Sequence, residues 1–260
     1  MDSEPRIELF DCAFDRVTMQ SAVERCVQWC RAPRTSHTVL TANAAILCMK
    51  RRDRELDAAC HAADLVVPDG ESVVWAARLA GTPLPERIAG VDFMAGLLAA
   101  AAREGLRVYL LGARREVVAK LAEGCERDYP GLVLAGRRDG YFREAEHAEI
   151  VEEIRKSRAD LLFVGMPSPF KETWCERHRR GLDVPVIMGV GGSFDVLAGY
   201  IRRAPRWLQA LGLEWFWRLC MEPRKLWKRY LFTNCEFLWL TLGVVARRRF
   251  GLGSAPKAAR

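Results

Sequence analysis

The chain has 260 residues, half of them hydrophobic, and a formal net charge of +7 at neutral pH. This length is enough to bury a complete core, and it suits one large domain or one domain with an appendage. Residues 197–260 hold 13 Lys and Arg against 3 Asp and Glu, so they carry +10 while residues 1–196 carry −3. This distribution excludes a uniformly basic protein and indicates an anionic partner for the tail, which could be nucleic acid, an anionic membrane or a diphosphate.

Nine cysteines are scattered over the predicted helices and strands and form no Cys-x-x-Cys pair. An odd number in a long chain argues against a disulfide framework, so we expect the reduced, buried thiols of a cytosolic protein. The first ten residues are acidic and lack the apolar stretch of a signal peptide. The longest apolar run near the end, Phe237–Ala246, is shorter than the roughly 20 residues that a membrane-spanning helix needs.

In the first half of the chain, apolar residues recur alternately at strand and helix spacing. The predicted elements are a hairpin within residues 6–17, a helix at 19–31, a strand at 38–41, a helix at 43–54, a strand at 65–67 that Pro68 ends, and helices at 73–79 and 91–103. Gly105 follows the last of these helices and suits its C-cap.

From residue 108 the alternation becomes regular. The predicted strands lie at 108–111, 132–135, 161–164 and 184–189, and the predicted helices at 115–127, 145–156 and 170–179. Repeated strand–helix units of this kind predict a Rossmann-like α/β fold, with a parallel sheet and helices on both faces, over residues 1–196. Residues 197–260 are predicted to form a helical appendage that breaks near Gly212 and Pro223.

The appendage is rich in tryptophan, with five of the eight Trp residues of the chain among its Arg and Lys residues. Trp rings with cations at amphipathic spacing are typical of a membrane interface, where the cations meet anionic lipid. The alternative is a pair of helices packed on the domain with a solvated basic face, and the two are compatible. No nucleic-acid-binding motif is present, so we expect no nucleic-acid partner.

Polar residues follow the predicted strands where each strand ends. Asp69 lies between a strand and a helix, at the edge where open α/β sheets bind ligands. Its carboxylate could act as a general base or merely cap the helix. Thr41 and Asn43 follow the preceding strand and could equally form a cap and an Asx turn. Arg87 lies in the loop after the helix that follows Asp69.

Two glycine turns, at Gly112 and at Gly189–Asp195, follow strands and could bind phosphate through backbone N–H groups. The second could also be a tight turn without a ligand. Neither a G-x-G-x-x-G nor a Walker motif is present, which argues against dinucleotide and ATP binding. No Asp-x-Asp pair is present to hold a metal on a nucleotide diphosphate. We therefore expect no cofactor and no metal, with Arg, Lys and helix dipoles offsetting the charge of a diphosphate.

A series of short motifs occurs in an order that resembles one known family. They are T-x-N at 41–43, P-D-G at 68–70, P-E-R-I-x-G-x-D at 85–92, Y-L-L-G at 109–112, D-G-Y-F at 139–142, L-F-V-G-x-P at 162–167, G-V-G-G-x-F-D at 189–195, G-L-E-W at 212–215 and E-P-R at 222–224. From about Thr38 to Tyr230 the chain resembles the WecG/TagA/CpsF glycosyltransferases. The resemblance implies a peripheral enzyme at the cytoplasmic membrane face. It would transfer a sugar, with inversion and without metal, from a UDP-sugar to a polyprenyl-diphosphate-linked sugar.

The resemblance also implies roles for individual residues. Asp69 matches the candidate base, and Thr41, Asn43 and Arg87 match residues that line the same pocket. The residues expected on the donor side are Gly112, Tyr141, Lys171, Gly189, Gly192, Phe194 and Asp195. The tail arginines Arg218, Arg224 and Arg229 match an appendage that closes over the site and engages diphosphate and an anionic membrane surface.

One residue departs from the family pattern, because Lys171 stands where the family commonly has Gln. In this respect the chain resembles the branch that adds glucose to a lipid-linked glucose, as in xanthan-type exopolysaccharide assembly. We therefore expect UDP-glucose as donor and glucosyl-diphospho-polyprenol as acceptor. The alternatives are an N-acetylmannosaminyl or N-acetylmannosaminuronic acid transferase acting on N-acetylglucosaminyl-diphospho-undecaprenol, and a non-enzymatic membrane-binding module. The sequence leaves a homo-oligomer open.

Overall fold

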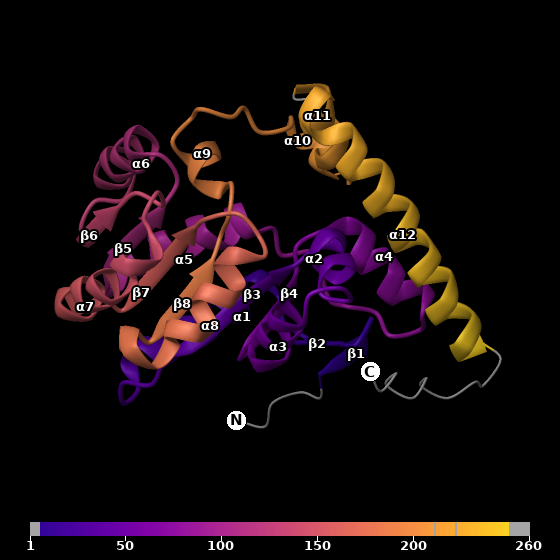
Figure 1. Cartoon of the computed structure of the whole chain (residues 1–260), viewed down its shortest axis with the longest axis horizontal. Coiled ribbons are helices and arrows are strands. Elements are labelled where there is room, and N and C mark those ends of the chain that lie inside the picture. The colour runs from indigo at the N-terminus through magenta and orange to yellow at the C-terminus, as the bar shows by residue number, and fades with distance from the viewer. Residues whose placement is uncertain (1–5, 211, 222, 250–260) are drawn as a thin grey trace.

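The computed structural model describes residues 6–249 except 211 and 222, and of residues 206, 210, 218, 224–226, 229, 230, 248 and 249 it describes the backbone alone. It contains a six-stranded parallel sheet flanked by helices and a helical C-terminal region (Figure 1). The predicted α/β architecture is therefore confirmed.

The strands of the sheet pair in the order β4-β3-β8-β7-β5-β6, and every pair is parallel. Their bounds are β3 (His37–Ala42), β4 (Leu65–Pro68), β5 (Arg107–Gly112), β6 (Val133–Arg138), β7 (Leu161–Gly165) and β8 (Val186–Gly189). The central strands β7 and β8 are buried along their whole length, as their continuous apolar runs require when helices cover both faces. A separate antiparallel hairpin, β1 (Ile7–Leu9) and β2 (Cys12–Phe14), confirms the predicted one.

Helices cover the two faces of the sheet in separate layers, because successive strand residues point to opposite sides. On β7, Phe163 packs in the core with α1 (Met19–Arg31), α5 (Gly90–Glu104) and α6 (Arg115–Asp128). Its neighbour Val164 packs in another cluster, with α7 (His147–Ser157) and α8 (Phe170–Leu182). A third cluster joins the hairpin to α2 (Ala44–Met49), α3 (Arg54–Ala62) and α4 (Glu71–Leu79).

The helix predicted over 43–54 is wrong in its extent. The structure has two helices there, since α2 ends at Met49 and α3 begins at Arg54. Asp53 explains the break, because its side chain accepts a hydrogen bond from the backbone N–H of Leu56 (3.0 Å) and so starts a new helix. The predicted C-cap of α5 is confirmed, with Gly105 in the left-handed region at φ +65°.

The C-terminal region forms α10 (Arg206–Ala210), α11 (Glu214–Met221) and α12 (Pro223–Arg249). The predicted break near Gly212 is confirmed, whereas residue 222, at the predicted break near Pro223, lies outside the described residues. Figure 1 shows α12 running along the side of the molecule that carries α2 and α4. Phe237 of α12 is buried against the ring of Phe10 (centroids 5.0 Å apart), whereas the next residues, Leu238 and Trp239, are exposed. None of the helices in the described ranges is both long and apolar enough to cross a membrane.

Candidate active site

The candidate residues gather at the carboxyl edge of the sheet. After β5 the chain continues to β6, which lies on one side of β5 in the sheet. After β7, the neighbour of β5 on its other side, the chain continues to β8, in the opposite direction across the sheet. Such a reversal opens a crevice at the strand ends, which is where ligands bind in open α/β sheets. The turns that follow β3, β4 and β8 lie on the β8 side of this point, and those that follow β5 and β6 lie on the other.

Asp69 directly follows β4 and is half-buried. Its backbone N–H donates to the carbonyl oxygen of Ala42 (3.0 Å), and its Oδ1 accepts from the backbone N–H of Gly90, the first residue of α5 (3.0 Å). The capping alternative is wrong for α4, whose N-cap is Gly70 without a side-chain bond. Instead the carboxylate lies at the N-terminus of α5, where the helix dipole favours negative charge.

Thr41 lies beside Asp69 and is buried in β3. A Cβ built on Gly90 would lie 3.5 Å from Thr41 Oγ1 and 3.7 Å from Asp69 Oδ2, so both oxygens face the same point on α5. Asn43 has a structural role here, since its Oδ1 accepts from the N–H groups of Ala45 (3.1 Å) and Ile46 (3.2 Å) and caps α2. The structure therefore brings Thr41 and Asp69 together and gives Asn43 the capping function that the sequence left open.

Arg87 approaches the same corner from the loop before α5. The next residue, Ile88, donates its N–H to the carbonyl oxygen of Pro68 (2.8 Å), which fixes this part of the loop against the end of β4. The Arg87 side chain is largely buried, and its Nη2 donates to Glu214 Oε2 of α11 (2.8 Å). The C-terminal helices thus contact a candidate site residue directly.

On the other side of the reversal, glycines allow close packing. Gly112 has φ +130°, and a Cβ there would lie 2.6 Å from the backbone of Gly165, so only glycine fits. A Cβ on Gly165 would in turn lie 2.6 Å from the ring of Phe194. Phe194 is fully buried in the core, so its ring does not reach the surface of the site. Glycine at these two positions therefore lets the ends of β5 and β7 lie close together.

The remaining predicted donor-side residues lie at the surface of this edge. Tyr141 is 76% exposed in the loop after β6, where its backbone N–H donates to Asp139 Oδ1 (3.0 Å). Gly192 is the N-cap of α9 (Ser193–Leu197) and has open space where a Cβ would be. The backbone oxygen of Asp195 accepts from the N–H groups of Tyr200 (2.9 Å) and Ile201 (3.0 Å) and closes the turn after α9.

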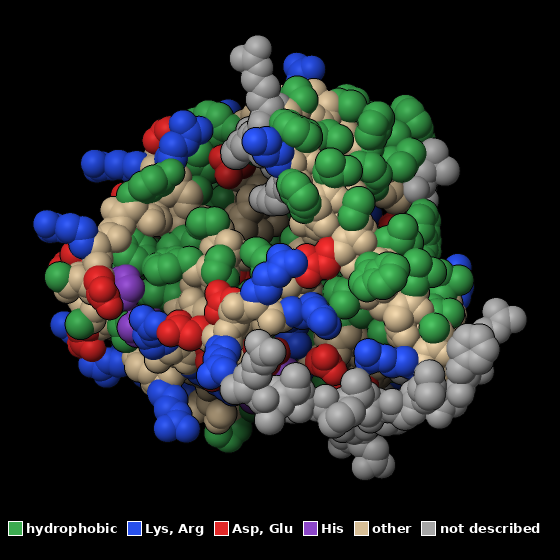
Figure 2. All heavy atoms as spheres, turned by 45° about the vertical axis from the view of Figure 1, so that its right-hand side comes forward, with side chains coloured by type: hydrophobic (Ala, Val, Ile, Leu, Met, Phe, Trp, Pro, Cys, Tyr) green, Lys and Arg blue, Asp and Glu red, His purple; other side chains and the backbone are tan. Residues whose placement is uncertain are grey.

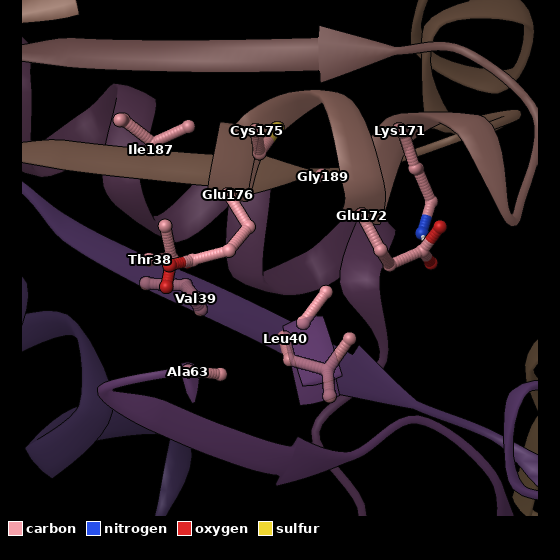
Figure 3. A pocket seen from close by; sticks show the side chains of 11 residues that line it. Thr38, Val39, Leu40, Ala63, Lys171, Glu172, Cys175, Glu176, Ile187 and Gly189 are labelled. Carbon is pink, nitrogen blue, oxygen red and sulfur yellow. Dashed lines mark hydrogen bonds and ion pairs between the residues drawn. The ribbon is translucent and has the colours of Figure 1, made fainter. Parts of the chain in front are cut away.

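Lys171 is buried at the start of α8 and forms an ion pair with Glu172, which is also buried. Its Nζ lies 3.6 Å from the position of a Cβ on Gly189, at the end of β8. Figure 3 shows the two charged side chains pointing toward each other at one end of a cavity between α8, β3 and β8. That cavity holds about 20 Å³, roughly one water molecule, and is too small for a sugar nucleotide.

Three predicted residues cannot be placed, since the side chains of Arg218, Arg224 and Arg229 lie outside the described part of the structure. Over the described ranges, no group of three or more His, Cys, Asp or Glu side chains is arranged to hold a metal ion. The cysteines described there are all free, and most are buried. Burial raises the pKa of the Cys12 thiol to about 11 and that of the Cys60 thiol to about 12.

Sequence reasoning missed two residues of this corner. Gly90 belongs to the quoted family pattern but carried no predicted contact, and its backbone N–H now proves to hold Asp69. Glu214 stands in the G-L-E-W motif and was not assigned a role. The feature of the sequence that could have singled it out is its negative charge, because it is one of only three acidic residues in the basic tail.

Comparison with known proteins identifies the family. A model described as the glycosyl transferase WecG/TagA/CpsF family matches residues 7–251. A relative from Bacillus spizizenii is 36% identical over 193 residues, which cover 74% of each chain. One from Bacillus subtilis is 34% identical over the same length. One from Staphylococcus aureus strain MW2 is 32% identical over 225 residues, or 86% of each chain. All three are named N-acetylglucosaminyldiphosphoundecaprenol N-acetyl-beta-D-mannosaminyltransferase.

These names overturn the expectation of a xanthan-type UDP-glucose transferase, which rested on Lys171 alone. In the structure the Lys171 ammonium is paired with the neighbouring Glu172, so the residue explains its own burial without reference to a donor sugar. The motifs, the fold and the match over residues 7–251 agree. The chain belongs to the WecG/TagA/CpsF family of glycosyltransferases.

Proposed function

We propose that this chain transfers N-acetylmannosamine from UDP-N-acetylmannosamine to N-acetylglucosaminyl-diphospho-undecaprenol. The observation that supports this most is the shared name of relatives that are 32–36% identical over 74–86% of the chain. The N-acetylmannosaminyl alternative of the sequence analysis therefore replaces the glucosyl reading.

Asp69 is our candidate for the general base. The hydrogen bond from Gly90 orients its carboxylate at the carboxyl end of β4. In the proposed step the acceptor hydroxyl oxygen forms a bond to the anomeric carbon, Asp69 takes the hydroxyl proton, and the bond from that carbon to UDP breaks. A single displacement of this kind inverts the anomeric centre. A positioned general base contributes roughly 10²–10⁴-fold to such a step.

Departing UDP gains negative charge on its diphosphate, and we assign cationic side chains to offset it. The loop that carries Arg87 is fixed against the end of β4, the strand that Asp69 follows, and Lys171 lies at the end of β8. The tail arginines Arg218, Arg224 and Arg229 complete the proposed set, with Thr41 beside the base. The turns at Gly112, Tyr141 and Gly189–Asp195 would bind the nucleotide. In this proposal no metal takes part.

An exposed apolar face supports a membrane surface as partner. Figure 2 shows hydrophobic side chains gathered on the side of the molecule formed by α4, α11 and α12. The exposed large hydrophobic residues of these helices are Trp75, Leu79, Trp215, Phe216, Met221, Trp227, Leu231, Phe232, Leu238, Trp239 and Leu242. Apolar patches of this extent mark interaction sites, and Trp beside cations suits the lipid headgroup layer. We propose that this face rests on the membrane that holds the lipid acceptor.

The test is UDP release by the full-length protein in detergent with EDTA present. The donors are UDP-N-acetylmannosamine, its C2 epimer UDP-N-acetylglucosamine, and UDP-glucose, each with an N-acetylglucosaminyl-diphospho-lipid acceptor. We expect release with the mannosamine donor only, and only when the acceptor is present. Turnover with UDP-glucose in its place, or no turnover with any donor, would overturn the proposal. Turnover that returns only when Mg²⁺ replaces EDTA would overturn its metal-free part.

A further inference from the structure

Four charged side chains form a chain of alternating sign between the body and α11. Arg87 Nη2 donates to Glu214 Oε2 (2.8 Å), and Glu214 Oε1 accepts from Arg203 Nε (3.2 Å). Arg203 in turn donates through Nη1 and Nη2 to the two oxygens of Asp92 (2.5 and 2.6 Å). Each Glu214 oxygen therefore holds one arginine, and the bidentate pair with Asp92 holds the second arginine in place.

The chain of charges ends on the helix that also holds Asp69. Asp92 lies in the first turn of α5, and Gly90, two residues before it, donates to the Asp69 carboxylate. The first turn of α5 therefore has two contacts. The backbone N–H of Gly90 binds the candidate base Asp69, and the side chain of Asp92 binds Arg203 of the Glu214 network. The side chains of Arg87 and Glu214 are 13% and 22% exposed, so little solvent screens their contact.

The backbone around Glu214 is built to deliver it to this place. Gly212 has φ +70°, and a Cβ there would lie 2.9 Å from Cβ of Glu71 in α4, so only glycine lets the turn approach this closely. Two residues later α11 begins with Glu214. Trp217, one turn along α11, donates its Nε1 to the carbonyl oxygen of Arg202 (3.1 Å) and ties the helix to the segment before it.

From this geometry we infer that Glu214 is a positioning residue for Arg87. It holds the guanidinium in a network that ends on the first turn of α5, the helix whose Gly90 binds Asp69, and it does so only while α11 is docked on the body. The inference rests on the proposed function, in which Arg87 offsets the charge of the departing UDP. A guanidinium has five N–H donors, and the contact with Glu214 engages one of its nitrogens, so the same group can also bind a diphosphate.

Removing the carboxylate should release the Arg87 side chain from its place. Glu214→Ala is expected to lower kcat at least tenfold and to weaken UDP binding. Glu214→Gln keeps the size of the side chain and an acceptor oxygen, so it should retain more activity than Glu214→Ala. The matched control is Glu236→Ala, which breaks a different ion pair between α12 and the body, with Arg52 (3.0 Å), and should keep kcat within about twofold.

A double-mutant cycle separates positioning from a general structural role. If Glu214 acts through Arg87, then adding Glu214→Ala to Arg87→Ala lowers kcat by less than about twofold further. The same cycle is measured as UDP dissociation constants by calorimetry on the full-length chain, which does not depend on the donor sugar. We expect the same lack of additivity there.

The outcomes separate this inference from the proposed function. Multiplicative losses in both cycles, or a Glu214→Ala variant with unchanged kcat and UDP affinity, would overturn the inference even if mannosamine transfer is confirmed. A non-additive UDP cycle without mannosamine transfer would support the inference and overturn the donor assignment. A wild-type chain that does not bind UDP would overturn both.

Discussion

Replacing Asp69 with Asn changes the chemistry of the candidate base while preserving its structural contact. The side-chain amide keeps an oxygen where Asp69 Oδ1 accepts from Gly90, at 3.0 Å. The variant therefore loses one negative charge and the ability to take a proton while it keeps this hydrogen bond. Asp69→Ala removes the acceptor oxygen as well, so the two variants separate catalysis from folding.

The expected magnitudes follow from these contacts. Loss of a general base should lower kcat by roughly 10²–10⁴-fold in both variants, with little change in the KM for the donor. Loss of the favourable charge at the start of α5 costs about 0.3–1 kcal/mol in both. Loss of the hydrogen bond to Gly90 costs Asp69→Ala about 1 kcal/mol more.

The assay measures kcat by UDP release and the free energy of unfolding by urea denaturation for each variant. Asp53→Asn is the matched control, because Asp53 also accepts from a helix N-terminus, the N–H of Leu56 (3.0 Å), but lies away from the site in the loop before α3. It should keep wild-type kcat and lose a similar amount of stability, about 0.3–1 kcal/mol, because it too removes a negative charge from a helix N-terminus. An Asp69→Asn variant with kcat within a few-fold of wild type would refute Asp69 as the base.

Three further predictions concern the surroundings of the site. Lys171→Met should destabilise the fold by about 3 kcal/mol in urea unfolding, because it leaves the partner carboxylate buried without a cation; an unchanged midpoint would contradict this buried pair. Gly112→Ala should lower the melting temperature by several degrees, whereas the control Gly192→Ala should leave it unchanged. The reason is that an added Cβ would clash with backbone at Gly112 but not at Gly192; equal melting temperatures of the two variants would count against this packing. Under native conditions a thiol reagent should modify two exposed cysteines first, because burial protects the remaining thiols and raises their pKa. Mass mapping that finds the first modifications at other cysteines would contradict this prediction. Those two cysteines are Cys220 and Cys235.

Local patterns predicted the sheet and its carboxyl edge well. The position of Asp69 followed from Leu65–Pro68, a short apolar run ended by proline. Its place beside Thr41 was implied only by the family resemblance, and the structure produces it through the parallel pairing of β3 and β4. The start of α3 was missed because Asp53 was read as part of a longer helix, although its side chain favours a cap. Apolar periodicity identifies helices more readily than it locates their ends.

Contacts between distant parts of the chain could not be predicted in the same way. Arg87 and Glu214 are 127 residues apart, and nothing in the spacing of either predicts their ion pair. Phe194 looked like a donor-side residue by its motif, yet the close approach that Gly165 permits places its ring in the core. A motif gives the order of residues along the chain, whereas burial and contact depend on how the elements pack.

Lys171 shows how a single substitution can mislead. The unusual cation was interpreted as a sign of a different donor, but it forms a buried ion pair with its neighbour in sequence. Identity spread over 193 to 225 residues is the broader observation, and it favours the mannosaminyl activity.

The most direct test of the proposed sugar transfer is the mass of the lipid product. Full-length protein is incubated with N-acetylglucosaminyl-diphospho-undecaprenol and equal concentrations of UDP-N-acetylmannosamine and UDP-glucose, and the extracted lipid is analysed by mass spectrometry. We expect the lipid to gain one N-acetylhexosamine with wild-type protein and to gain it far more slowly with Asp69→Asn. A gain of one hexose, or an unchanged lipid, would contradict it.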